Sequence, residues 1–281
     1  MKKVISASRR TDLVAFFSDW LSSVLEKEVV RVYGPSGRTY TIDLDPASIH
    51  TVVLWSKNFA SLIENRSGLK DEILKYDQVY LHFTITGLGG TFIERGVPSC
   101  STALLQIKDL VKVVGRPERI SVRFDPIVYW KEGEGIHSNL HLFEKIAPVL
   151  HEQGIKDIRV SFAQWYRKAK RRASKHNFIY IDPPRAQKMK DALYLVQVAQ
   201  RWGLSLYSCS QDFLTAIPEI RPSSCIDGFL LQRLHPSGDP VSLKKDKTQR
   251  PECRCTESKD IGSYTQFCPH SCLYCYANPK I

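Results

Sequence analysis

Short runs of β-branched and aromatic residues alternate with segments of helical periodicity along most of this chain, and this alternation limits the possible folds more than any other feature. Apolar residues recur at helical spacing in 139–154 and 186–203, and each segment ends on a glycine, a common helix stop. Nearly continuous apolar strands separated by helices indicate a parallel sheet covered by helices. The runs predicted to be strands are 3–8, 51–56, 79–86, 120–125, 158–163 and 204–209.

The number of these units favours one closed architecture. Six strand–helix units without a Rossmann-type glycine fingerprint favour a (β/α) barrel of the TIM-barrel kind over an open sheet. At 281 residues and 43% hydrophobic, the chain suits one barrel, so a single domain over 1–281 is expected. Chemistry in such barrels gathers at the carboxyl ends of the strands. The polar residues there are candidates for holding a cofactor or substrate: Arg9, Arg10, Asp12, Lys57, Thr84 and Arg123.

The apolar content indicates where the protein is located, and the net charge indicates which partners it could bind. No apolar run approaches 18 residues, so no transmembrane helix is expected, and the N-terminus lacks the apolar stretch of a secretory signal. A cytoplasmic protein is therefore expected. The net charge of +11 suits nucleic acid, although many basic enzymes bind only small anions. The basic stretch 166–176 is either a solvated helix face or a phosphate-contacting surface, with Phe162, Trp165 and Tyr166 available to stack a base.

The cysteines are crowded at the end of the chain. Five of the eight fall between 253 and 275, which in a cytoplasmic protein of this size indicates metal binding rather than disulfides. Three of them are spaced C-x3-C-x2-C and can hold three corners of a [4Fe–4S] cube, with one iron left open. These are the terminal cysteines: Cys268, Cys272 and Cys275.

Four other thiols form a possible second site. They can complete a second [4Fe–4S] cluster or a structural zinc site. The first two can also be ordinary small buried residues, since free cysteine is often buried. This second cysteine set consists of Cys209, Cys225, Cys253 and Cys255.

Zinc is the main alternative for all of these thiols. A C-x-C followed by C-x3-C-x2-C, with His270 inside, could hold one or two zinc ions in a small ribbon. Zinc ribbons usually use paired C-x2-C knuckles, which this chain lacks. These thiols therefore also allow a non-enzymatic function, as a zinc- or iron–sulfur-binding, nucleic-acid-binding protein that carries out no radical chemistry.

The terminal cysteines also carry a resemblance. CPHSCLYC, with Tyr274 just before the third cysteine, resembles the signature of radical S-adenosylmethionine enzymes. The resemblance implies that the terminal cysteines hold a [4Fe–4S] cluster and that Tyr274 lies beside the cofactor. It implies that the open iron chelates S-adenosylmethionine, and that a donor such as flavodoxin or ferredoxin supplies the electron for cleavage to a 5′-deoxyadenosyl radical. Auxiliary clusters are common in that superfamily, so the resemblance favours iron–sulfur for the second cysteine set.

The position of the cysteine loop departs from that superfamily. There the loop normally follows the first barrel strand, whereas here only six residues follow Cys275. A circular permutation reconciles the two arrangements, because barrel termini often lie close together. We expect 258–267 to form a last strand beside 3–8 and to lead into the cysteine loop. Residues 205–281 would then form the iron–sulfur-binding portion of the barrel.

A narrower resemblance covers nearly the whole chain. SRRTD, RFDPIVYW and CRCTESKDIGSYTQFCPHSCLYCYAN resemble a bacterial family of unassigned function, domain of unknown function 1848. That family carries a radical-SAM-like cysteine cluster at its C-terminus and is distantly similar to radical SAM proteins of the spore photoproduct lyase type. The resemblance implies no particular substrate.

Overall fold

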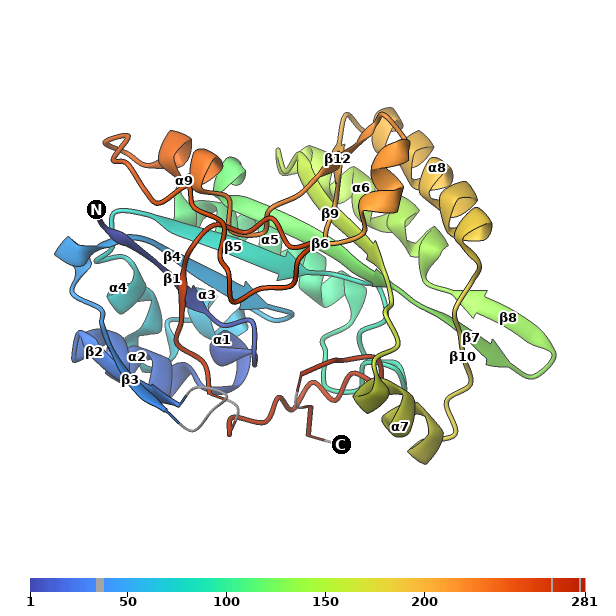
Figure 1. The fold of residues 1–281 in the computed structure, drawn as a ribbon, viewed down its shortest axis with the longest axis horizontal. Helices are drawn as coiled ribbons and strands as arrows, with labels where there is room; N and C mark the ends of the chain where they lie inside the picture. Colours follow the sequence, from blue (N-terminus) through green and yellow to red (C-terminus); the bar gives the residue numbers. More distant parts are fainter. Residues whose placement is uncertain (34–37, 264, 278, 281) are drawn as a thin grey trace.

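A central parallel sheet organises the protein, as a computed structural model describing residues 1–33, 38–263, 265–277 and 279–280 shows (Figure 1). Its eight strands follow the order β12-β11-β9-β6-β5-β4-β1-β13, and all neighbours are parallel. The strands of this sheet are β1 (Lys3–Ala7), β4 (Ile49–Ser56), β5 (Val79–Thr84), β6 (Ile120–Ile127), β9 (Asp157–Phe162), β11 (Ser205–Ser208), β12 (Ile220–Pro222) and β13 (Lys259–Asp260).

The predicted alternation of strands and helices is confirmed. Each of the six predicted runs contains one strand of the sheet, and the two predicted helical segments contain α6 and α8. β12 and β13 stand at the two ends of the strand order, with no ladder between them in the described part of the chain. A mixed α/β fold with a large parallel sheet is therefore established, whereas closure into a barrel stays a proposal.

Helices cover one face of this sheet and form the main core. Apolar side chains of α1–α6 and α8 pack there against the strands, among them Leu21, Ile107 and Phe143, which are fully buried. Ile5 and Leu54 face the same core from β1 and β4. The helices are α1 (Leu13–Phe16), α2 (Ser18–Glu26), α3 (Ala60–Ile63), α4 (Leu69–Ile73), α5 (Cys100–Val114), α6 (Phe143–Glu152), α7 (Arg167–Lys175), α8 (Arg185–Arg201) and α9 (Gly228–Leu234).

The C-terminal part of the chain covers the other face of the same strands. Val4, Val53 and Tyr80 alternate along the strands with residues of the main core, so the pleat points them to the opposite side. There they pack with Ile226 and Leu231, which lie before and within α9. The described residues of 205–281 are therefore part of the same folded unit as the sheet.

The predicted last strand is present but short. Among the described residues of 258–267, Lys259 and Asp260 alone form a strand, which pairs in parallel with Ile5 and Ser6 of β1. The chain then turns away, because Asp260 accepts a hydrogen bond from the backbone N–H of Gly262 at 3.0 Å. The predicted parallel pairing of the two ends of the chain is thus confirmed, over two residue pairs.

Smaller elements were not predicted. β2 (Val29–Tyr33) and β3 (Thr39–Asp43) form an antiparallel hairpin, and β7 (Tyr129–Glu132), β8 (Gly135–Ser138) and β10 (Tyr180–Ile181) form a three-stranded sheet. These strands are mostly exposed and carry little of the apolar pattern that identifies the central strands. Among the described helices, none is both long enough and apolar enough to cross a membrane.

Candidate functional site

One cavity of about 300 Å³ lies at the carboxyl ends of the parallel strands. That volume is within the range of small-molecule sites, about 300–1,000 Å³. The terminal cysteines and the second cysteine set all line it. The other predicted site residues line it as well: Arg9, Arg10, Asp12, Lys57, Thr84, Arg123 and Tyr274. Segments that are far apart in the sequence therefore meet at this single cavity.

Backbone contacts with the loop after β5 fix the terminal cysteine loop. Leu273 N–H donates to Ile93 O at 3.0 Å, and Gly96 N–H donates to His270 O at 3.1 Å. The Nδ1 of His270 lies 2.9 Å from Gly96 O. A Cβ on Gly96 would stand 2.4 Å from Pro269 O, so only glycine allows the two backbones to approach this closely.

Asp12 connects the cysteine loop to the sheet. Its carboxylate caps α1 by accepting from Ala15 N–H at 2.9 Å and also accepts from Ser56 Oγ at 2.8 Å. The second oxygen accepts from Lys57 N–H at 2.9 Å and lies 2.7 Å from His270 Nε2. With both oxygens engaged, the carboxylate positions the cysteine loop from its buried place in the cavity wall.

A buried ion pair lies beside Cys272. Lys57 Nζ is 2.8 Å from Glu94 Oε1, the hydroxyl of Tyr274 donates to the same carboxylate, and Lys57 also lies over the Tyr274 ring at 5.7 Å. Burial alone would lower the pKa of Lys57, but the charge of Glu94, followed by that of Cys272, raises it. The lysine is therefore a fixed cation at the cysteine loop.

Burial sets the protonation of the terminal cysteines. It raises the pKa of Cys268 to about 12, and it raises the pKa of Cys272 well above its ordinary value. The pKa of Cys275 is also raised by burial. In the absence of a metal all three are therefore thiols at neutral pH, and a metal that binds them must displace their protons.

The second cysteine set is in a different electrostatic environment. Cys209 Sγ lies 3.3 Å from Cys225 Sγ, and hydrogen bonds from Cys209 and then Cys255 lower the pKa of Cys225 well below its ordinary value. A hydrogen bond with Cys255 lowers the pKa of Cys253 to about 6. Cys225 and Cys253 therefore have thiolate character, which suits metal ligands, whereas hydrogen bonds with Cys225 raise the pKa values of Cys209 and Cys255.

Two buried arginines stand against the second cysteine set. Arg123 Nη1 donates to Cys225 Sγ at 2.8 Å, and its other amino group pairs with Asp125. Burial opposes the charge of Arg9, but the nearby Cys255 and then Asp260 raise its pKa. Both arginines were predicted to hold a cofactor or substrate, and the structure places them beside these thiols.

Two stacked rings, those of Trp55 and His82, form an aromatic floor beneath these arginines. The guanidinium carbons of Arg9 and Arg123 lie 5.6 and 5.5 Å from the ring centroid of Trp55, and His82 stacks on that ring at 4.1 Å. Burial lowers the pKa of His82 well below its ordinary value, so this imidazole is neutral. Its Nε2 lies 2.6 Å from Cys225 O, which ties the floor to the second cysteine set.

The cysteines are not arranged as a compact zinc site. Around one Zn²⁺ at about 2.3 Å, the sulfur atoms would lie about 3.8 Å apart. Among the described residues neither cysteine set brings three sulfur atoms within 4.8 Å of one another. In the second cysteine set the 3.3 Å between Cys209 Sγ and Cys225 Sγ is shorter than this, so a bound metal ion or cluster would move these two thiols apart.

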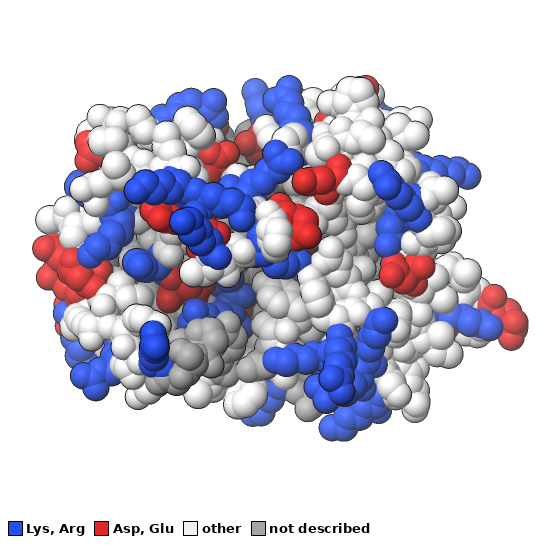
Figure 2. All heavy atoms as spheres, in the orientation of Figure 1, with Lys and Arg blue, Asp and Glu red and all other residues white. Residues whose placement is uncertain are grey.

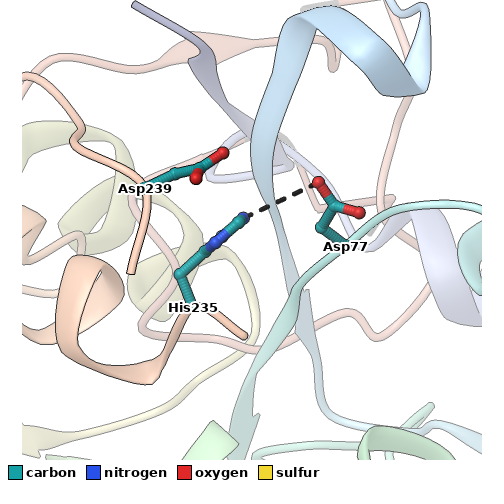
Figure 3. A group of neighbouring side chains, drawn as sticks. All are labelled: Asp77, His235 and Asp239. Carbon is teal, nitrogen blue, oxygen red and sulfur yellow. Dashed lines mark ion pairs between the residues drawn. The ribbon is translucent and has the colours of Figure 1, made fainter. Parts of the chain in front are cut away.

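The described residues do contain one compact donor group, which lies outside the cavity. Asp77, His235 and Asp239 bring three donor atoms within 4.8 Å of one another, and His235 Nε2 faces Asp77 at 3.8 Å (Figure 3). The ammonium of Lys2 already lies 2.8 and 3.3 Å from the two carboxylates. Asp77 precedes β5, at the end of that strand away from Thr84 and the cavity. This group is an ion-pair cluster at the opposite end of the sheet.

Some residues in or beside the cavity had no signal in the sequence. Glu94 follows a glycine-rich turn and has no neighbouring motif, yet it is fully buried beside Lys57. Arg250 comes from a segment without regular structure and donates to Gln164 at 2.9 Å and to Tyr166 at 2.5 Å. Cys100, the one cysteine outside both sets, begins α5 and packs against the main core.

Comparison with known proteins gives a family for the chain. Neither the curated proteins nor the solved structures contained a match. One family matches residues 4–277, which is nearly the whole chain including the terminal cysteines. The chain therefore belongs to the family described as Domain of unknown function (DUF1848).

Proposed function

We propose that the protein is a radical S-adenosylmethionine enzyme, with a [4Fe–4S] cluster on Cys268, Cys272 and Cys275. The observation that carries this proposal is the cavity itself, where three closely spaced thiols meet the polar strand ends of a parallel sheet. When bound, a reduced cluster of this kind supplies one-electron reductive cleavage of S-adenosylmethionine. The C-x3-C-x2-C spacing is what favours this chemistry over other uses of three thiols.

The cavity has unused hydrogen-bonding capacity for a polar cofactor. Arg9 Nη2 and Thr11 Oγ1 are buried donors that line it and have no hydrogen-bond partner in the described part of the protein. Buried donors are costly to leave unpaired, so their presence here supports a polar ligand. Lys57 and Tyr274 lie on the same wall and would orient the carboxylate or ribose of S-adenosylmethionine.

The proposed fold is a circularly permuted barrel. The support is the pairing of β13 with β1, because the chain passes from β13 into the cysteine loop within a few residues. A permuted barrel would have the cysteine-bearing unit at this position. The ends of the strand order, β12 and β13, would then approach each other around the C-terminal segment.

The second cysteine set would hold an auxiliary [4Fe–4S] cluster. Arg9 and Arg123 would balance the charge of its thiolates, since both already contact or face these sulfur atoms. The thiolate character of Cys225 and Cys253 supports a metal centre at this set.

Metal analysis of anaerobically purified protein tests the cofactors. The protein should contain close to eight irons and eight sulfides if both sites are [4Fe–4S], and it should be brown. Cys272→Ala should retain about half of the iron, whereas Cys100→Ala should retain all of it. Stoichiometric zinc without iron would refute the proposal and favour the zinc alternative.

Product analysis tests the activity. Protein reduced with dithionite should cleave S-adenosylmethionine slowly to 5′-deoxyadenosine, even without a substrate. Cys272→Ala should be inactive, and a Cys253→Ala variant should retain this uncoupled cleavage. Methylthioadenosine as the main product would show that a different C–S bond breaks. Absence of any product from fully loaded, reduced protein would refute the radical mechanism.

A further inference from the structure

α7 presents a set of cations that no acidic side chain neutralises. Five of its basic side chains are exposed, and none of these makes an ion pair within the part of the chain that the structure describes. Figure 2 shows basic side chains gathered over this helix at the lower right, with little acid beside them. The exposed cations of α7 are Arg167, Lys168, Lys170, Arg171 and Lys175.

The same helix contacts the terminal cysteine loop. Arg172 donates to Cys275 O at 2.6 Å and to Leu273 O at 3.2 Å. Ala169 and Ala173 are buried in a small core that includes Leu273, so one face of α7 packs toward the loop. The cations therefore lie on the outer side of an element that borders the cavity.

Two exposed tyrosines connect these cations with the cavity. Tyr166 immediately precedes α7, and Tyr276 immediately follows Cys275; their ring centroids are 6.2 Å apart. Both line the cavity, yet they are 39% and 60% exposed. The two aromatic side chains at the cavity mouth offer flat surfaces for stacking. The adjacent row of cations offers charges that can bind phosphates.

We propose that α7, Tyr166 and Tyr276 bind single-stranded nucleic acid, with phosphates along α7 and a base stacked at the cavity mouth. Proteins that bind single strands combine cations along the phosphates with aromatic side chains that stack on the bases. The cations of α7 and the two tyrosines supply both. The inference rests on the proposed function in one respect: the nucleotide bound at the cavity mouth would be the substrate of the radical reaction. An acidic protein would complement the charges, but it would not account for the two tyrosines at the opening.

Binding is measured with the anaerobic, metal-loaded protein and fluorescein-labelled single-stranded DNA and RNA oligonucleotides. Anisotropy is followed from about 50 to 200 mM salt, because log K should fall linearly with log salt, by about 0.7 for each phosphate contact. Lys170→Gln with Arg171→Gln should reduce this slope by about 1.4. Lys27→Gln with Lys108→Gln removes the same charge at exposed positions outside α7 and should leave the slope unchanged.

The tyrosine contribution is tested separately. Tyr166→Ala should weaken binding about 5- to 150-fold without changing the slope, as expected for loss of one stacked base. Tyr166→Phe keeps the ring and should bind like wild type within a few-fold. Equal binding of Tyr166→Ala and Tyr166→Phe would refute the stacking role.

Other outcomes overturn the whole inference. No binding at the lowest salt concentration, a preference for duplex, or equal binding of polyglutamate would each contradict a single-strand site. Cleavage of S-adenosylmethionine is measured without oligonucleotide, so the two proposals fail independently. Loss of oligonucleotide binding with intact cleavage would refute only this inference, and binding without cleavage would refute only the proposed function.

Discussion

Replacing Asp12 with asparagine tests how the cysteine loop is held. The side chain keeps its size, and its remaining oxygen can still accept from Ala15 N–H and Ser56 Oγ. The amide nitrogen replaces the oxygen that faces Lys57 N–H and His270 Nε2. One backbone donor loses its acceptor, and the charge that binds His270 disappears.

The size of the effect follows from these contacts. Hydrogen bonds to a charged group contribute about 1.5–3 kcal/mol each, so loss of two predicts a decrease of ~3–6 kcal/mol in the free energy of unfolding. Asp12 is 7% exposed, so water cannot readily replace the missing partners. His270 lies between Cys268 and Cys272 in the sequence, so the terminal cysteine loop should lose its fixed position as well.

Urea unfolding of metal-free protein measures the stability, and iron analysis after anaerobic reconstitution measures the site. Asp12→Asn should lose about half of the iron, from the terminal cysteines, while the second cysteine set keeps its share. Asp45→Asn is the matched control, because this exposed carboxylate caps a short turn through Ala47 N–H at 2.8 Å and contacts no cysteine. If the two variants were equally stable and equally loaded, the positioning role of Asp12 would be wrong.

Three further predictions concern the same wall. Gly96→Ala should displace the cysteine loop and lower the free energy of unfolding by about 1–3 kcal/mol, because the new Cβ would meet Pro269 O at 2.4 Å. Gly135→Ala is the control, because the nearest contact of its new Cβ is a movable side chain. Equal melting temperatures of the two variants in calorimetry would contradict the prediction. Lys57→Met should lower the free energy of unfolding by about 3–5 kcal/mol, because it leaves Glu94 charged and buried. The double variant with Glu94→Gln should regain part of this stability, and no regain in urea unfolding would refute the pairing. With the second cysteine set changed to serine, affinity for Co²⁺ should rise as the pH is raised from 6 to 8, by up to about tenfold per pH unit for each displaced proton, because burial raises the terminal thiol pKa values; absorption titrations independent of pH would contradict this.

The sequence alone determined the strands of the sheet and the candidate ligands. Each central strand is a nearly continuous apolar run, because both of its faces are covered, and such runs are readable without a structure. The C-x3-C-x2-C spacing identified three thiols that must lie close together, since only two or three residues separate them. The pairing of β13 with β1 was also predicted, although a turn at Gly262 makes the strand shorter than the predicted 258–267.

Only the tertiary structure decided how these parts meet. Cys209 and Cys225 approach Cys253 and Cys255 because the C-terminal segment crosses the face of the sheet opposite the main core, and no local pattern encodes that path. Glu94 and the contacts of Asp12 depend on loops whose backbones hydrogen-bond across more than a hundred residues of sequence. Strand formation follows from the periodicity of neighbouring residues, whereas the cavity is assembled from single side chains on separate segments. Their spacing along the chain therefore carries no information about their distances in space.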